Sequence, residues 1–492
     1  MSVQNQETTT TIMKLRLLFH KYYSENPKSI DVPQQIHTRE FAIQAWEANW
    51  RCRQQTITDD SGNKIQTGCG QSGKSFKTIT QCPNCASKAV SVTSWTRHQG
   101  YKSKEDLLRN LTKIAPHSVY HSAAFYGVPT AISMSEKEWM GAELVFDIDA
   151  DHLDLQCAND HDAWKCKNPE CNQSGTGNPP EICPSCGEYW YCNNLDCDKQ
   201  GEGKLPKICP DCKSKTSRKL FGFHTRKWIC EKCINTAKNH TTRLYDEFLV
   251  GDLGFDPDKI QLNYSGHRGY HIRVHDSKVY KLDSDARMEI VQYVMGSGFR
   301  GDKAIISQGG SSLIPSRDIP GWSGKLADAM VEFIQNIDTY SGSEKWVSTL
   351  KEKKVIAIDM LRRPRPVLSA KVKGVGIKSW QEIAEKAVEL FGSEIDRPVT
   401  HDIHRVIRLI GSLHGKTGFT VTELTRDSLD KFNPFNDAIA FNEGTLNVRF
   451  HKGSVPAFII NDEKYGPFNG GSTELPTAAA VFVLGKEVAL LE

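Results

Sequence analysis

The cysteines of this 492-residue chain follow a pattern that constrains part of the fold. Four of them have the spacing Cys166-x4-Cys171-x11-Cys183-x2-Cys186, and four more repeat it 26 residues later. Nearby glycines, prolines and isoleucines repeat with them, which indicates a tandem duplication. Four thiolates at such spacing are typical of a closed, tetrahedral, structural zinc site. We therefore expect two zinc ribbons, one with Cys166, Cys171, Cys183 and Cys186 as ligands and one with Cys192, Cys197, Cys209 and Cys212.

Two further ligand sets flank or precede this duplication. Cys157-x3-His161 lies before it and Cys230-x2-Cys233 after it, so these four residues would close into one Cys₃His site. His224 is a competing ligand with poorer spacing. The remaining cysteines predict a fourth site, within which the pairing of Cys52 with Cys69 has the weakest support. Cys82 and Cys85 form a good C-P-x-C knuckle in this last set of Cys52, Cys69, Cys82 and Cys85, and a free buried thiol is the alternative chiefly for Cys52.

A second feature is the alternation of apolar residues and carboxylates over residues 144–152. This period is typical of a strand with one buried face, on which Phe146 and Ile148 would point into a core. Asp147 and Asp149 would then project together from the other face. Two adjacent carboxylates repel each other unless a cation lies between them, and hard divalent metals prefer such oxygens. The alternative is a strand edge with solvated acids.

Two other segments carry groups that suit a polyanion. Residues 264–271 form a glycine-rich turn with a hydroxyl, a guanidinium and an imidazole, followed by a second alternating strand. Residues 396–418 begin with Asp396 and continue with a cluster of arginines, histidines and a lysine. A tight turn with incidental polar groups is the alternative for the first segment. Together with Asp147 and Asp149, these parts favour metal-dependent nucleotidyl transfer.

Taken together, these blocks resemble the catalytic small subunit of archaeal and eukaryotic replicative DNA primases. The resemblance includes 39–41, 95–98, 142–152, 265–271 and 396–418, in family order. It implies an α/β fold, with a primase-type mixed-sheet catalytic lobe, helical additions and inserted zinc ribbons. The zinc knuckle that relatives carry after the D-x-D strand is similar to the Cys₃His set. A large primase subunit, forming a heterodimer, is the implied partner.

The resemblance also assigns roles to residues. It implies that Asp147, Asp149 and Asp396 are catalytic ligands of Mg²⁺ or Mn²⁺. Arg408 occupies a position where eukaryotic relatives carry lysine, which keeps the charge but changes the hydrogen-bonding geometry. His267 replaces an arginine of many relatives, so a phosphate role for it is not implied. The residues implied to bind the nucleotide are Ser265, Arg268, His271, Arg408, His414 and Arg97.

Composition is consistent with an enzyme of the cytoplasm. The formal net charge is +3 and the pI about 8.1, so nucleic-acid contacts must come from local basic patches. No stretch reads as a signal peptide or a membrane span. The match of Gly68–Ser75 to a Walker A motif is interpreted as a ribbon loop, since a zinc knuckle follows it closely. Basic residues near Phe221, Phe223 and Trp228 suit a single-stranded template, with core aromatics and solvated lysines as the alternative.

The expected organisation interleaves one catalytic core with insertions. Residues 1–48 are expected to be an N-terminal helical segment, with Phe41, Ala45 and Trp46 at helical spacing. The other expected units are an inserted zinc ribbon at 49–90, the first part of the core at 91–156, a zinc-binding module with duplicated ribbons at 157–235, the second part of the core at 236–296, a peripheral subdomain at 297–378, and the third part of the core with C-terminal strands at 379–492.

The resulting hypothesis is a primase that joins nucleoside triphosphates into short primers de novo on a single-stranded DNA template during replication. One alternative is a repair or plasmid polymerase of the same superfamily, which extends existing primers. The other is a zinc-ribbon nucleic-acid-binding protein whose polymerase core has decayed. The intact carboxylates and phosphate-binding residues argue against decay.

Overall fold

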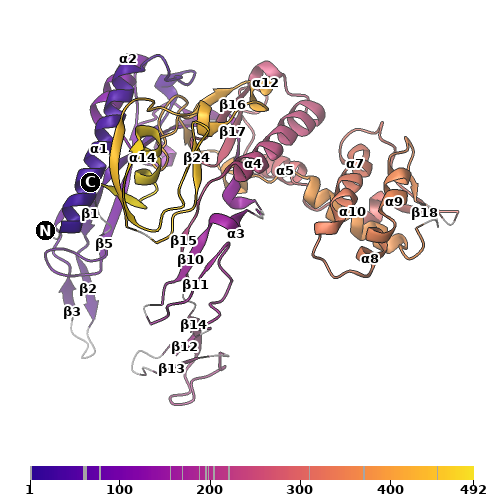
Figure 1. Ribbon diagram of the computed structural model, residues 1–492, viewed down its shortest axis with the longest axis horizontal. Coiled ribbons are helices and arrows are strands. Elements are labelled where there is room, and N and C mark those ends of the chain that lie inside the picture. The colour runs from indigo at the N-terminus through magenta and orange to yellow at the C-terminus, as the bar shows by residue number, and fades with distance from the viewer. Residues whose placement is uncertain are drawn as a thin grey trace.

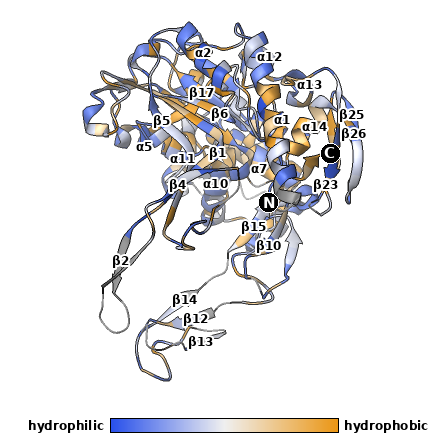
Figure 2. Cartoon of the chain, turned by 90° about the vertical axis from the view of Figure 1, so that its left-hand side faces the viewer, coloured by the Kyte–Doolittle hydropathy of each residue, from blue (hydrophilic) through white to orange (hydrophobic). Residues whose placement is uncertain are grey.

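The computed structural model describes residues 3–58, 64–76, 79–153, 155, 157–168, 170–187, 189–193, 197, 199–202, 205–219, 222–309, 311–368, 372–451 and 453–492. A central body of sheets and helices carries three projections (Figure 1). A helical subdomain, residues 297–392, lies to one side. A first arm, residues 49–93, and a second arm, residues 163–226, extend from the body in a common direction, as Figures 1 and 2 both show.

Two antiparallel sheets form the centre of the body. One has the order β21 (Val406–Arg408), β6 (Ser118–Ser122), β1 (Phe41–Cys52) and β4 (Ser72–Ser75), with β5 (Val90–Gln99) also paired to β1. The other has the order β22 (Thr422–Leu424), β16 (Ile260–Tyr264), β17 (Gly269–Val274) and β9 (Leu144–Asp149).

The α/β class is confirmed, but a mixed strand direction is not. Every strand pair among the described residues is antiparallel. A short turn joins β16 to β17 and forces them to be antiparallel, and β9 then pairs with the free edge of β17 in the opposite direction.

Strand β9 has the alternation that the sequence predicts. Phe146 and Ile148 are fully buried in the main hydrophobic core, together with Tyr270 and Ile272 of β17. The register pairs Asp147 with His271, and Asp149 with Gly269. The carboxylates therefore project from the opposite face, next to the glycine-rich turn.

Helices cover the sheets of the body, where hydrophobic residues are concentrated (Figure 2). Against the sheet of β9 and β17 pack α4 (Glu231–Arg243), its π-helical continuation η4 (Leu244–Asp252), and α5 (Ser284–Val294). The other helical elements of the body are α1 (Val3–Glu25), α2 (Lys104–Ile114), α11 (Arg397–His401), α12 (Arg426–Leu429), α13 (Pro434–Asp437), η1 (Ile36–Thr38), η2 (Met134–Glu136), η3 (Ala150–His152) and η5 (Pro257–Lys259).

The C-terminal part combines strands with one apolar helix. Helix α14 (Thr477–Gly485) is buried along almost its whole length, so that its apolar surface completes the main core. Around it lie the sheet of β23 (Thr445–Phe450), β26 (Gly471–Pro476) and β27 (Ala489–Leu491) and the hairpin of β24 (Phe458–Ile460) and β25 (Glu463–Tyr465). A further strand pair, elsewhere in the body, is β7 (Ala124–Tyr126) with β8 (Trp139–Ala142).

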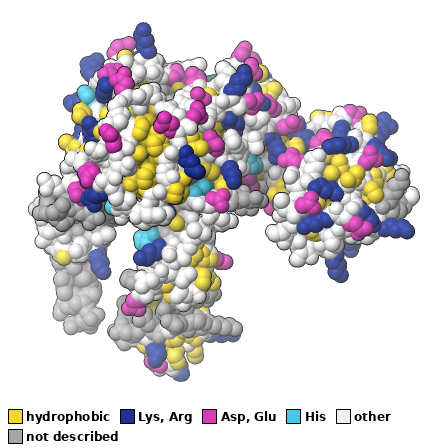
Figure 3. All heavy atoms as spheres, viewed as in Figure 1, with side chains coloured by type: hydrophobic (Ala, Val, Ile, Leu, Met, Phe, Trp, Pro, Cys, Tyr) yellow, Lys and Arg dark blue, Asp and Glu magenta, His cyan; other side chains and the backbone are white. Residues whose placement is uncertain are grey.

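The helical subdomain has a hydrophobic core of its own and forms a separate lobe beside the body (Figure 3). Helix α10 (Ile377–Phe391) belongs to it, because Trp380, Ile383 and Val388 pack in that core. The predicted boundary at residue 378 is therefore wrong. The other elements are α6 (Gly301–Ala304), β18 (Ile306–Gln308), β19 (Ser311–Leu313), α7 (Trp322–Gln335), η6 (Ile337–Thr339), α8 (Lys345–Glu352), α9 (Lys354–Leu361) and β20 (Val367–Leu368).

The expected helix over Phe41–Trp46 is also wrong, because this segment begins the long strand β1. The register of β1 with β5 shifts between Gln44 and Asn49, so several residues of β1 bulge out of the ladder. A bulge interrupts the period of two, so that Phe41 before it and Ala45 and Trp46 within it have a helix-like spacing.

The two arms consist of short strands around the cysteines. The first arm contains the outer part of β1, β4 and β5, and a hairpin of β2 (Gln55–Thr58) and β3 (Lys64–Thr67). The second arm follows α3 (Ala158–His161) and contains β10 (Ala163–Cys166), β11 (Ser174–Thr176), β12 (Tyr189–Cys192), β13 (Gln200–Glu202), β14 (Thr216–Lys219) and β15 (Phe223–Arg226).

The arms hold three copies of one ribbon, where the sequence indicated a duplication of two. Each copy is a three-stranded antiparallel sheet, in the orders β4-β1-β5, β11-β10-β15 and β13-β12-β14. The central strand of each copy carries a Trp-x-Cys motif. The indole of its tryptophan lies over a glycine of the neighbouring strand. A Cβ on that glycine would come within 2.9 Å of the ring in each copy. The pairs are Trp50 with Gly73, Trp164 with Gly175, and Trp190 with Gly201.

Among the residues that the structure describes, no helix has the length and apolar character needed to cross a membrane.

Candidate active site

Three carboxylates meet at the exposed face of β9. Asp147 and Asp149 lie side by side on that face, as the alternation predicts. Asp396 comes from a segment more than 240 residues away, and its backbone N–H donates to the Asp147 carbonyl at 2.8 Å. The structure therefore brings together the three aspartates that the resemblance singles out.

The electrostatics of this group favour a cation. Burial, reinforced by the negative charges of Asp149 and Asp396, raises the pKa of Asp147 to about 7. A bound divalent cation would remove this penalty, and an all-carboxylate donor set suits Mg²⁺ or Mn²⁺. The donor chemistry of the three residues thus fits the implied metal.

The turn between β16 and β17 packs closely against the end of β9, next to the carboxylates. The Ser265 backbone N–H donates to the Gly269 carbonyl at 2.9 Å, and the Gly269 N–H donates to Ser265 Oγ at 3.3 Å. A Cβ on Gly269 would lie 2.0 Å from the Ile148 carbonyl oxygen, so only glycine allows β17 to approach β9 here. This close approach holds Arg268 over the site: its guanidinium contacts Asp151, and its Nε lies 3.7 Å from Asp149 Oδ1.

His271 faces Asp147 across the ladder, with its Nε2 3.6 Å from Asp147 Oδ1. Burial and the nearby charges of Arg408 and Arg273 lower the pKa of His271 to about 3, so the ring is neutral. The Asn263 side-chain amide faces Nδ1 at 3.3 Å. With that amide donating to Nδ1, the ring proton lies on Nε2 and can be donated to an anion in the site.

Cationic groups from residues 405–416 face the carboxylates. The Arg408 guanidinium lies over the Tyr120 ring at 4.7 Å, and its Nη1 is buried without a hydrogen-bond partner among the described residues. His414 is not one of these cations, because burial and the nearby Arg408 hold its pKa well below the ordinary value, and its neutral ring stacks on His267 at 4.8 Å. Arg405 lies 4.0 Å from Asp396. An unpartnered buried guanidinium N–H is a strong donor that a phosphate oxygen could satisfy.

Except for Asp396, the site groups described above line one cavity of about 370 Å³. Its lining includes seven residues singled out in the sequence: Asp147, Asp149, Ser265, Arg268, His271, Arg408 and His414. Arg97 is not among them, because its guanidinium forms a two-bond pair with Glu40 at 2.9 and 3.1 Å. His267 lines the cavity too, but its Nε2 lies 2.7 Å from Lys486 Nζ, and burial holds its pKa well below the ordinary value.

The cavity also contains residues to which sequence reasoning gave no role. Asp151 continues the alternation of Asp147 and Asp149, and Arg405 and Lys416 stand inside the quoted 396–418 block, so a local signal existed for all three. Trp95 likewise stands inside the quoted 95–98 block. For Gln44, His117 and Tyr120 no local signal existed, because the segments that carry them reach the cavity only through the pairing of β1, β5 and β6.

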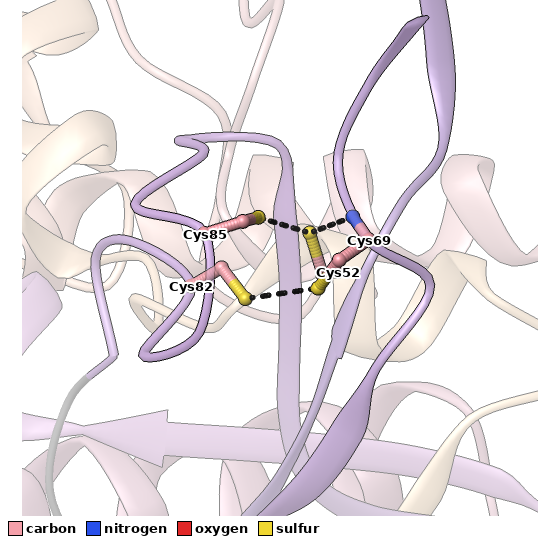
Figure 4. Close-up of side chains that lie close together, drawn as sticks. All are labelled: Cys52, Cys69, Cys82 and Cys85. Carbon is pink, nitrogen blue, oxygen red and sulfur yellow. Dashed lines mark hydrogen bonds between the residues drawn. The ribbon is translucent and has the colours of Figure 1, made fainter.

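The four predicted cysteine and histidine sets also come together. In each set the four ligand atoms lie within 4.8 Å of one another. The close sulfur–sulfur distances in the ribbon clusters run from 3.2 to 3.9 Å, near the value of about 3.8 Å for thiolates that share a tetrahedral zinc ion. Figure 4 shows Cys52 in the first-arm cluster with Cys69, Cys82 and Cys85, so each of the four sets could hold zinc.

The Cys₃His set contains His161 and not His224. His161 Nε2 lies 3.2 Å from Cys233 Sγ, and its Nδ1 lies 2.8 Å from Asp162 Oδ1. Asp162 also accepts from the Trp228 backbone N–H at 2.8 Å. A carboxylate behind a ligating imidazole fixes the orientation of the ring, which is the arrangement that metal-binding histidines usually have.

Two other sequence interpretations have clear outcomes. Ser72–Ser75, the end of the Walker A match, is strand β4 of a ribbon and opens no helix, which excludes a P-loop. The proposed stacking role of Trp228 is wrong, since only 1% of the residue is exposed and its ring packs on Phe458 and Phe482. Phe223 packs edge-on against Trp164, and Phe221 lies outside the described residues.

Known proteins are similar in sequence to this chain over most of its length. A family model described as "DNA primase small subunit" matches residues 224–426, which include the β16–β17 turn, Asp396 and the cationic segment. The chain is 30% identical over 415 residues to the DNA primase small subunit PriS of Methanothrix thermoacetophila, covering 79% of this chain and 87% of the relative. It is 27% identical over 485 residues to PriS of Nitrosopumilus maritimus, covering 98% of this chain and 99% of the relative.

The relatives therefore match the chain over the elements that build the cavity as well as in overall length. With carboxylates on β9, a glycine turn against them and a cationic segment opposite, the chain belongs to the DNA primase small subunit family.

Proposed function

We propose that this chain is a primase catalytic subunit that joins nucleoside triphosphates into short primers, de novo, on a single-stranded DNA template. The observation that carries the proposal is the single cavity in which the carboxylates of β9 face Arg268, Arg405, Arg408 and Lys416. A triphosphate with its divalent cations needs both groups at once: oxygens for the metal and fixed cations for the phosphates.

The carboxylates of Asp147, Asp149 and Asp396 would hold Mg²⁺ or Mn²⁺, which supplies Lewis-acid activation of a 3′-hydroxyl and neutralises charge on the pyrophosphate. Ser265 and the backbone of the β16–β17 turn offer short-range donors to phosphate oxygens. His271 donates from a neutral ring, so that it orients a phosphate without adding charge.

Arg268 and Arg408 perform different tasks in this proposal. Arg268 is held between the carboxylates and the turn, so it would bridge the metal end of the triphosphate to the turn. Arg408 is fixed from behind by the Tyr120 ring, and its free Nη1 would donate to a phosphate oxygen. The positions of both guanidiniums before substrate binds reduce the entropy lost on binding.

The zinc clusters would have a structural function. Each offers four thiolate or imidazole ligands, which leaves no open position for chemistry. The family also suggests a large subunit as a heterodimer partner, since the relatives are named as small subunits.

The test is primer synthesis on unprimed single-stranded DNA with labelled ribonucleotides and Mg²⁺ or Mn²⁺, with and without the large subunit. We expect short products that disappear in the Asp147→Ala/Asp149→Ala variant. Extension of an annealed primer with no product on bare template would favour an extending polymerase. No product in either assay, from folded and zinc-loaded protein, would favour a nucleic-acid-binding protein.

A further inference from the structure

The first arm carries a groove that lies near the active-site cavity along strand β5. The groove has a volume of about 400 Å³ and lies on one face of the ribbon β4-β1-β5. Strand pairing places Asn49 opposite Lys74 and Thr93, and Arg51 opposite Ser72 and Ser91. These six residues present one amide, three hydroxyls and two cations. Trp50 and Gly73 complete the lining, which contains no carboxylate.

The groove and the cavity are in contact through strand β5. Thr93 lines the groove, Trp95 lines the cavity, and the Trp95 backbone N–H donates to Thr93 Oγ1 at 3.1 Å. Trp95 is 39% exposed as a residue, and its ring lies 4.7 Å from the Tyr120 ring, which the Arg408 guanidinium also contacts. Trp95 and Thr93 therefore connect the proposed nucleotide site to the groove that contains Lys74 and Arg51.

The two cations are not required by the ribbon fold. All three ribbons keep the tryptophan, the glycine beneath it and the cysteines. At the place of Lys74, however, the second copy has Thr176, and at the place of Arg51 the third copy has Tyr191. Both cations of the first copy are exposed, and neither side chain pairs with a carboxylate within the described part of the chain.

The sequence around the groove is also rich in basic residues and lacks acidic ones. From Ser61 to Lys104 the chain contains seven lysines and arginines and no aspartate or glutamate. A run of this length without an acid is unusual in a chain that is one quarter charged and nearly balanced overall. Arg97 pairs with Glu40, but Lys74 and Lys88 are exposed, so this stretch adds positive charge near the cavity, where a polyanion would be attracted.

We propose that this groove binds the single-stranded template as it passes the active site, with Trp95 stacking a base and Arg51 and Lys74 contacting phosphates. This rests on the proposed function. When synthesis starts without a primer, the template is the only nucleic acid long enough to extend beyond the cavity. Basic side chains along a backbone, with an aromatic ring for a base, are the means by which single strands are bound without sequence preference.

The test compares Arg51→Ala/Lys74→Ala with the unaltered chain, using zinc-loaded full-length protein and a fluorescent single-stranded DNA. Anisotropy is measured over a salt series. Loss of two phosphate contacts should lower the slope of log affinity against log salt by about 1.4, since each contact contributes about 0.7 for single strands. In primer synthesis, the KM for template should rise while kcat at saturating template stays unchanged.

Lys88→Ala is the matched control. Lys88 is an exposed lysine of the same arm that does not line the groove, so its loss should leave the slope within error of the wild type. Zinc content and circular dichroism must be equal in all variants. An unchanged slope in the double variant, or an equal loss in Lys74→Ala and Lys88→Ala, would overturn the proposal.

The experiment also distinguishes failure of the proposed function from failure of the template assignment. If the wild type makes no primers, the proposed function fails, but the binding comparison still decides whether the groove holds single strands. If the double variant binds bare single strands normally and loses affinity only for an annealed primer–template, the groove holds the duplex and the assignment to the template is wrong.

Discussion

Replacing Asp147 by asparagine should stabilise the metal-free protein while it abolishes primer synthesis. The reason is that the position of Asp147, which we propose binds a metal, lowers the stability of the metal-free fold. Burial and the neighbouring Asp149 and Asp396 raise its pKa from 3.8 to about 7. The folded state therefore binds the proton of this carboxyl more tightly than the unfolded chain does, and ionisation at neutral pH opposes folding.

The magnitude follows from the two pKa values. Their difference corresponds to about 4 kcal/mol at about 1.4 kcal/mol for each pH unit. Because 23% of the side chain is exposed, screening by solvent lowers this to about 2–3 kcal/mol. The penalty is absent below pH 3.8, grows between pH 3.8 and 7, and is complete above pH 7. Asparagine is close in shape to the protonated carboxyl and does not have this penalty.

The assay is thermal unfolding of zinc-loaded protein in buffer free of Mg²⁺ and Mn²⁺, between pH 5 and 8, because chelators would also remove zinc. Asp147→Asn should unfold at a higher temperature than the wild type near pH 8, and the gap should narrow toward pH 5. Added Mn²⁺ should raise the unfolding temperature of the wild type more than that of the variant. Exposed Asp427→Asn serves as the control. An Asp147→Asn variant that unfolds at or below the wild-type temperature near pH 8 would refute the reasoning.

Three other substitutions probe the supports of the site. Glu143→Gln should lower the free energy of unfolding by about 3–5 kcal/mol in denaturant titration, because it leaves the buried Arg39 and its neighbours without a carboxylate. Gly269→Ala should abolish primer synthesis and lower the unfolding temperature, because its Cβ would push β17 away from the Ile148 carbonyl. His161→Ala should reduce the zinc content measured by atomic spectroscopy by one ion per chain, while the ribbon clusters keep theirs.

Each of these has an outcome that would contradict it. A Glu143→Gln variant as stable as the wild type would show that its cations are solvated in solution. Full activity in Gly269→Ala would mean that β17 can retreat without disturbing the turn. Unchanged zinc in His161→Ala would indicate that another residue, such as His224, replaces it as ligand.

The sequence was sufficient wherever the information was local. Alternation over residues 144–149 determined which side of β9 carries the aspartates, because a strand repeats every two residues. The spacing of cysteines determined all four ligand sets, since two ligands from one knuckle must be close in the chain to reach one ion. Even the choice of His161 over His224 followed from spacing.

Only the tertiary structure determined what distant segments contribute. Strand pairing brings Gln44, Trp95 and Tyr120 to the cavity, and a salt bridge to Glu40 holds Arg97 outside it. The bulge in β1 gives this strand a helix-like spacing of apolar residues, so the sequence predicted a helix. A zinc ribbon at 49–90 was expected, but the hairpin β2–β3, inserted between Cys52 and Cys69, changes its cysteine spacing, so that only the strands and the Trp–Gly contact show its likeness to the other two ribbons. Pattern in the chain determines the local periods and ligand pairs, whereas contacts between remote residues depend on how whole strands pair and pack.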